Sequence, residues 1–142
     1  MAIFVNENLV QWMLAIFVGG MGVADGFEDV FRHFTLEGYL FFSLIRVIPY
    51  ALLAIVVLLS IKKDRWSVTG IAWGGLLAIV LTITYLSWVS LEPLYTDAHA
   101  SSTTALAFLV IPFFAVATGA IGSLAGAMLI YIKRTVAGVR AG

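Results

Sequence analysis

One arginine stands inside an otherwise uncharged apolar run and is the side chain best suited to bind a ligand. Arg46 lies within residues 38–61, which contain no other charged residue. A mid-helix arginine costs about 2.5–3.5 kcal/mol on membrane-insertion scales, so its presence needs a physical reason. Its long stem can carry the charge to lipid head groups, or the charge can pair with Asp25. Alternatively, its planar fork of donors can bind an anion or a lipid head group.

Further side chains are expected at a similar depth. Tyr50 follows Arg46 by one helical turn, and two prolines, Pro49 and Pro112, interrupt apolar runs at this level. Each proline removes a backbone N–H, so paired kinks can open a cavity, with plain helix bending as the default explanation. The candidate ligand-binding or anion-binding residues are Arg46, Tyr50, Tyr85 and Asp25.

The two histidines and two nearby aspartates are the residue types that suit a metal. Asp29 precedes His33 by four residues, and Asp97 precedes His99 by two. These four ligands suit zinc if the two segments meet, but the spacing matches no familiar metal motif. Solvated histidines are therefore the default expectation, with zinc or a haem held between the histidines as alternatives. We expect no cofactor, and the absence of cysteine excludes disulfides and thiolate ligands.

Composition points to a membrane protein. The chain has 142 residues, of which 62% are hydrophobic and 11% are charged. Globular domains carry about 25% charged residues, so the deficit indicates a lipid environment. Net charge is zero, and no basic patch predicts a nucleic-acid partner. Neither a phosphate-binding loop nor a nucleophile motif is present, so no residue is assigned as catalytic, and an enzyme is the less favoured class.

Four apolar runs define the expected elements, because only a helix carries such a run through lipid. They cover residues 9–24, 38–61, 68–91 and 103–132. The first run is short and rich in glycine, so a re-entrant hairpin is the alternative there. The predicted fold class is an all-α integral membrane protein: a single domain over residues 1–142, forming a bundle of four transmembrane helices.

A short amphipathic helix is predicted between the first and second spans, over about residues 26–35. Phe27, Val30, Phe31 and Phe34 share one face of this segment, while charged residues take the other. Asp25, three residues before Glu28, resembles an N-cap. We expect the helix to lie in the membrane interface. A helical loop packed on the bundle is the alternative.

Basic residues set the expected orientation. Those on one side of a four-span arrangement are Lys62, Lys63, Arg65, Lys133, Arg134 and Arg140, whereas Arg32 falls on the other. Cytoplasmic loops carry the excess of Lys and Arg. Both termini are therefore expected in the cytoplasm, in a plasma membrane of bacterial type.

Small residues mark the expected helix contacts, because lipid offers no hydrophobic drive for helices to associate. The candidate packing residues are Gly19, Gly70, Gly74, Gly119, Gly122 and Gly126. They can face one another within the chain or face a second copy in a homo-oligomer.

Two functional hypotheses follow. The first is a small, non-enzymatic and oligomeric membrane protein, acting as a pore or small transporter or as a subunit of a larger membrane complex. Its partners are membrane lipid and either copies of itself or another membrane subunit. The alternative is an outer-leaflet enzyme or a lipid- or anion-binding protein that uses Arg46 and the Asp and His groups on the outer side.

Overall fold

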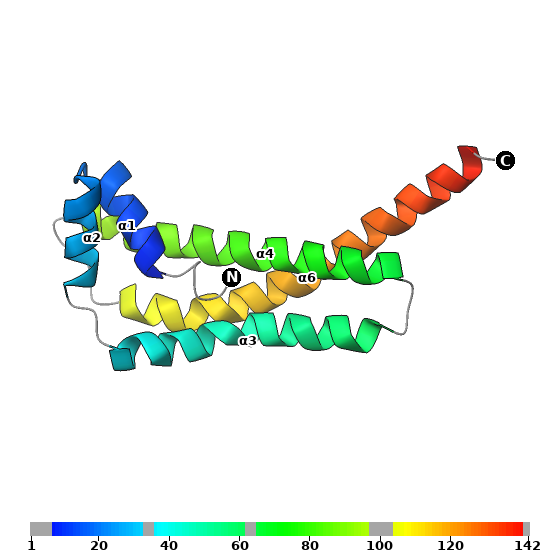
Figure 1. Cartoon of the computed structure of the whole chain (residues 1–142), viewed down its shortest axis with the longest axis horizontal. Helices are drawn as coiled ribbons and strands as arrows, with labels where there is room; N and C mark the ends of the chain where they lie inside the picture. The colour runs from blue at the N-terminus through cyan, green and yellow to red at the C-terminus, as the bar shows by residue number, and fades with distance from the viewer. Residues whose placement is uncertain (1–6, 33–35, 62–64, 97–103, 141–142) are drawn as a thin grey trace.

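The computed structural model describes residues 7–32, 36–61, 65–96 and 104–140, and the regular structure in these ranges is helical. Three long helices lie side by side, and the shorter helices gather at one end of them (Figure 1). The helices in chain order are α1 (Glu7–Phe17), α2 (Val23–Phe31), α3 (Leu36–Ser60), α4 (Arg65–Leu91), α5 (Pro93–Thr96) and α6 (Thr104–Arg140).

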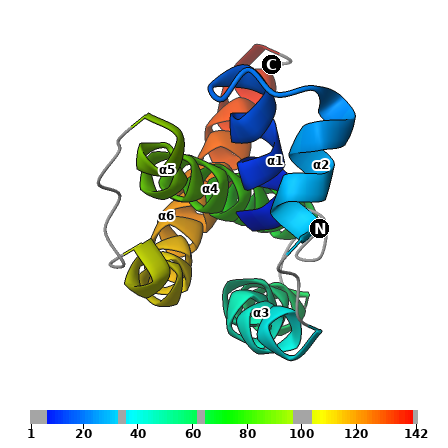
Figure 2. The same ribbon diagram turned by 90° about the vertical axis from the view of Figure 1, so that its left-hand side faces the viewer.

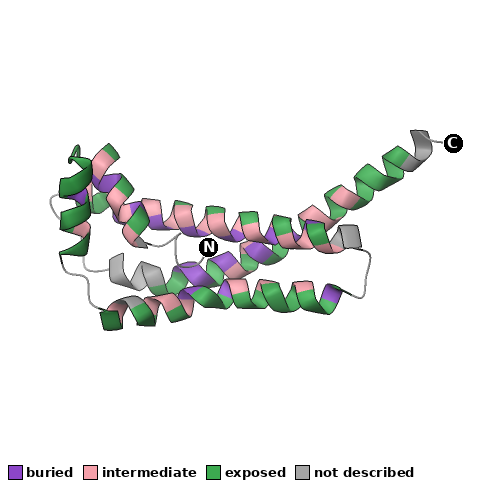
Figure 3. Ribbon diagram, in the orientation of Figure 1, coloured by how far each residue is buried: buried purple, intermediate pink, exposed green. Residues whose placement is uncertain are grey.

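Three stretches of the described chain are long and apolar enough to cross a membrane. They are Leu36–Ser60 on α3, Val68–Thr96 on α4 and α5, and Leu109–Ala137 on α6. Each exceeds the roughly 20 residues that a spanning helix needs. Exposed residues cover the outward sides of these helices, and buried ones face the interior (Figure 3). This is the architecture of an integral membrane protein.

The expected count of four spanning helices is not confirmed. The first apolar run, residues 9–24, is divided between α1, a turn and the first residues of α2. With 11 residues, α1 is about 16 Å long, against a bilayer core of about 30 Å. The turn that follows the helix contains Gly20, which takes a positive φ of 66°, a conformation that favours glycine. The amide of Met21 then donates a hydrogen bond to the carbonyl of Ala15 at 3.0 Å.

The short helix α2 runs crosswise to the long helices at their end (Figures 1 and 2). It begins three residues earlier than the sequence predicts, and residues 33–35 of the expected helix lie outside the described residues. Gly22 occupies the N-cap position and makes no side-chain cap, so the expected capping role of Asp25 is wrong. Asp25 instead lies in the first turn, where a negative charge suits the helix dipole.

The closest packing joins α4 to α6, and the two helices run antiparallel (Figure 1). Gly70 lies against Gly126, and Gly74 lies against Gly122. A methyl group on Gly70 would lie 2.5 Å from the carbonyl oxygen of Gly126, so only glycine permits this approach. Further along, the hydroxyls of Thr82 and Thr118 share a hydrogen bond of 2.8 Å. Small residues thus bring the two backbones together, as is usual for helices in lipid.

Helix α3 packs less extensively against α4 and α6 than these two pack against each other, and the end-on view shows it set apart (Figure 2). The bundle core consists of Ile79, Ile83, Ile111 and Ala115, against which Tyr50 and Leu53 of α3 pack. A second cluster of Val10, Leu14 and Leu91 attaches α1 to the end of α4. The bundle is therefore a close α4–α6 pair with α3 along one side.

Candidate functional site

Arg46 lies on the inward side of α3. It is about ten residues, roughly 15 Å, from the start of that helix at Leu36. Its side chain is only 5% exposed. A guanidinium that reached lipid head groups along the outside of the bundle would be exposed, so this arginine does not extend into lipid. The positive charge is enclosed by protein.

Two hydroxyl groups accompany Arg46 on the same helix face. Ser43 precedes it by three residues and Tyr50 follows it by four, spacings that place side chains on one face. Both hydroxyl oxygens are buried and have no hydrogen-bond partner within the part of the chain that the structure describes. The charge of Arg46 acts electrostatically on the Tyr50 hydroxyl. A buried hydroxyl without a partner costs about 1–3 kcal/mol, so these oxygens favour a polar ligand.

The site lies at the seam between α3 and the α4–α6 pair. Tyr50 packs on the core cluster formed by Ile79 and Ile83 of α4 with Ile111 and Ala115 of α6. Pro49 is fully buried beside it and donates no backbone hydrogen bond. Local unwinding of α3 therefore costs less at this point than elsewhere in the helix.

The polar surface does not continue across the membrane. Beyond Tyr50, the next half-buried residues of α3 are Leu53 and Val57, and the next buried one is Ser60 at the helix end. Two turns of the seam are thus lined by aliphatic side chains on α3. A single chain with this arrangement has a polar site in the half of α3 that begins at Leu36 and aliphatic side chains along the other half.

The structure separates the other two candidate residues from this site. Tyr85 is 67% exposed on the outward side of α4, along which Trp73, Leu77 and Leu81 are exposed at four-residue intervals. Asp25 is exposed on α2. Arg46 and Tyr50 are therefore brought together, whereas Tyr85 and Asp25 are not. Ser43 was missed by sequence reasoning, although its position one turn before Arg46 was a usable signal.

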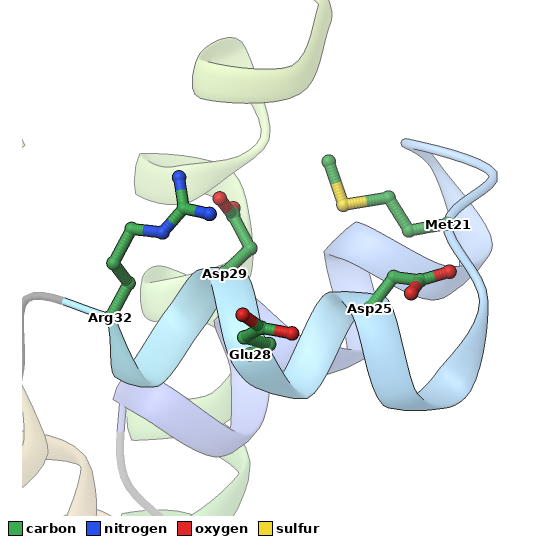
Figure 4. Close-up of a pocket in the computed structure, with 5 residues that line it drawn as sticks. All are labelled: Met21, Asp25, Glu28, Asp29 and Arg32. Carbon is green, nitrogen blue, oxygen red and sulfur yellow. The ribbon is translucent and has the colours of Figure 1, made fainter.

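An acidic pocket lies on the polar side of α2. It has a volume of about 340 Å³ and is open to its surroundings, and its lining residues are Met21, Asp25, Glu28, Asp29 and Arg32 (Figure 4). Asp29, one of the predicted zinc ligands, lies here. The other three, His33, Asp97 and His99, lie outside the described residues. Within the described ranges, no three His, Asp or Glu side chains are grouped so as to hold a metal ion.

No protein-family model matches the chain, and neither a curated protein nor a solved structure matches it significantly.

Proposed function

We propose that this protein is a non-enzymatic membrane protein that binds an anionic group at the seam between α3 and the α4–α6 pair. The observation that supports the proposal is the burial of Arg46 at 5% exposure on the inward side of a spanning helix. An ionisable side chain within a membrane span is costly to bury and is by default a functional-site hypothesis. The hydroxyls of Ser43 and Tyr50 supply neutral donors beside the charge.

The chemistry of the three side chains suits an oxyanion. Arginine presents several N–H donors in one plane, which matches the oxygens of a carboxylate, sulfate or phosphate. A serine and a tyrosine hydroxyl each donate one further hydrogen bond. In the low dielectric of the bundle interior, these bonds are stronger than in water. Each group binds or orients the anion, and none of them needs to react.

Access to the site requires α3 to move relative to the α4–α6 pair. The pair is held by glycine contacts that leave little freedom, whereas α3 packs on it more loosely and contains Pro49. Displacement of the outer half of α3 would admit an anion to Arg46, while Leu53 and Val57 keep the inner half closed. Binding, or transport that depends on this movement, is thus better supported than an open pore in one chain.

We also propose that several copies assemble. The sequence alone suggested an interface between copies formed by the glycine faces, but we propose a different one. The glycines of α4 and α6 face one another within the chain. Contacts between copies, or with a subunit of a larger complex, would therefore use the bulky outward faces, such as that of Trp73, Leu77 and Leu81.

The orientation that we propose has three spans and places α1 outside the cell. The C-terminal end of α3 and the start of α4 lie at the end of the bundle away from α1 and α2, as does the C-terminal part of α6 (Figure 1). Basic residues of the sequence, such as Lys133 and Arg134, belong to that end, which the positive-inside rule assigns to the cytoplasm. The four-span expectation placed the first residues in the cytoplasm, whereas three spans place them on the opposite side. Arg46 then lies in the outer half of the membrane.

Thermal unfolding in dodecyl maltoside tests anion binding, with tryptophan fluorescence as the readout. The probes are sodium phosphate and sodium sulfate, each compared with sodium chloride at equal ionic strength. A ligand at one hundred times its Kd stabilises the folded state by about 2.7 kcal/mol. We expect this stabilisation in the wild type, its loss in Arg46→Leu and a reduction in Arg46→Lys, because lysine lacks the planar fork.

Two further variants keep the test informative if Arg46→Leu does not fold. Ser43→Ala and Tyr50→Phe each remove one hydroxyl and should weaken the anion effect without removing the charge. Arg32→Leu is the matched control, because it removes an exposed arginine on α2. An anion effect of equal size in Arg46→Leu and the wild type, or no effect of either oxyanion on the wild type, would contradict the proposal.

A further inference from the structure

The helix α2 has one face of apolar and one face of charged side chains. At 100° per residue, Gly26, Val30, Val23, Phe27 and Phe31 occupy one side. The opposite side carries Asp25, Glu28, Asp29 and Arg32, the residues that line the acidic pocket (Figure 4). Within the apolar side, Gly26 is buried, whereas Phe27 is 52% exposed.

Contacts with α1 explain why only one edge of the apolar side is buried. The indole N–H of Trp12 donates a hydrogen bond to the carbonyl of Val23 at 3.0 Å. The same ring meets Phe27 edge to face, with centroids 6.1 Å apart. A methyl group on Gly26 would lie 3.4 Å from the Cβ of Ala15, so the two helices touch at this point. The rings of Phe27 and Phe31, whose centroids are 4.4 Å apart, form the exposed edge.

The α1–α2 hairpin is fixed at the end of the spanning bundle. Val10 and Leu14 of α1 pack on Leu91, the last residue of α4. The hydroxyl of Tyr95 on α5 donates a hydrogen bond to the carbonyl of Gln11 at 3.4 Å. Because α2 runs crosswise there (Figure 1) and α3 begins its apolar run at Leu36, α2 lies at the level where lipid meets water.

We propose that the Phe27–Phe31 edge of α2 inserts into the head-group region of the leaflet at this end of the bundle, and that it binds electroneutral rather than anionic lipid. Aromatic side chains of an interfacial helix favour this boundary. Among the described residues that follow, the next exposed large apolar side chains are those of Leu36, Leu40 and Phe41, which belong to the lipid-crossing helix α3. Lipid contact therefore continues from one helix to the next.

The charges on α2 select the class of lipid. Its polar side presents three carboxylates, from Asp25, Glu28 and Asp29, against the single guanidinium of Arg32. Basic residues on the polar side attract anionic lipids to an interfacial helix. This helix carries the opposite balance, so anionic head groups are repelled and choline or ethanolamine head groups are accepted.

Site-directed spin labelling tests the proposal, since the chain has no cysteine to remove. Nitroxides would be placed singly by Phe27→Cys, Phe31→Cys, Glu28→Cys and Asp29→Cys, and the full-length protein reconstituted into phosphatidylcholine vesicles. Accessibility to oxygen reports lipid, and accessibility to a water-soluble nickel chelate reports water. We expect at least a threefold higher ratio of oxygen to nickel accessibility at positions 27 and 31 than at 28 and 29. Leu44→Cys, on the exposed side of α3, is the control for correct insertion.

Three outcomes would overturn the proposal. The first is equal nickel accessibility at all four α2 positions while the Leu44→Cys label remains oxygen-accessible, which would place α2 in water. The second is protection of positions 27 and 31 from both reagents, with spin–spin broadening that disappears on dilution with unlabelled protein, which would identify a second copy as the occupant. The third is a higher ratio at positions 27 and 31 in phosphatidylglycerol vesicles than in phosphatidylcholine, which would reverse the expected lipid preference. None of these readouts depends on anion binding at Arg46.

Discussion

The contact between Gly74 of α4 and Gly122 of α6 should tolerate no added methyl group. A methyl on Gly122 would lie 2.5 Å from the Cβ of Ala78 and would also press on the carbonyl oxygen of Gly74. Carbon atoms in contact normally lie about 3.5–4.0 Å apart. Neither group moves without the α4 backbone, so the two helices must separate by roughly 1 Å.

The energetic cost follows from that separation. A gap of about 0.5–1 Å forfeits a quarter to a half of the dispersion energy of the atoms that it parts, and overpacking substitutions typically cost about 1–3 kcal/mol. We therefore expect Gly122→Ala to lower the free energy of unfolding by about 2 kcal/mol.

Unfolding in mixed micelles of dodecyl maltoside and sodium dodecyl sulfate measures this change, with the four tryptophans as reporters. Ala120→Leu is the matched control, because Ala120 is exposed on the same helix, and it should stay within about 0.5 kcal/mol of the wild type. The reasoning would be refuted if Gly122→Ala were as stable as the wild type, or if Ala120→Leu were destabilised equally.

Two further predictions concern topology and the α4–α6 contact. A membrane-impermeant maleimide added outside intact cells should label Asn8→Cys and Glu28→Cys. The Lys133→Cys variant should react only after the cells are permeabilised. If position 8 were labelled only from the cytoplasm, the four-span arrangement would be correct instead. The hydroxyl of Thr82 donates a hydrogen bond of 2.8 Å to that of Thr118, so a double-mutant cycle of the two valine substitutions should give a coupling of about 0.6 kcal/mol, the average for such bonds in membranes. A coupling of zero would show that the bond contributes nothing to stability.

The three long helices were predictable from the sequence because strongly apolar runs of this length can cross lipid only as helices. The first run differs in length and in its glycines. Sequence reasoning counted residues 9–24 as a span, whereas Gly20 at positive φ ends the turn that follows α1. When an apolar run is too short to cross the membrane, the backbone preferences of its residues determine its conformation. Hydropathy does not measure those preferences.

The sequence predicted at which level of the bundle the site residues lie, but not which way their side chains face. Counting residues places Arg46, Tyr50 and Tyr85 at similar levels of the bundle, yet Tyr85 faces outward and Arg46 inward. The rotation of each helix about its axis depends on how all three pack, which spacing along one chain does not determine. For the same reason, the sequence does not distinguish glycines that face a neighbouring helix from glycines that face a second copy. The zinc hypothesis for His33 and His99 stays a prediction.

The unequal lengths of the spanning helices make the bundle responsive to hydrophobic mismatch. Helix α4 contains 27 residues and α6 contains 37, against 25 in α3. Helices longer than the hydrocarbon core tilt or locally thicken the bilayer, and this sorts proteins among membranes of different thickness. The glycine contacts hold α4 and α6 at one crossing angle, so these two must tilt together, whereas α3 adjusts separately. A change in bilayer thickness would therefore alter the angle at the seam that encloses Arg46.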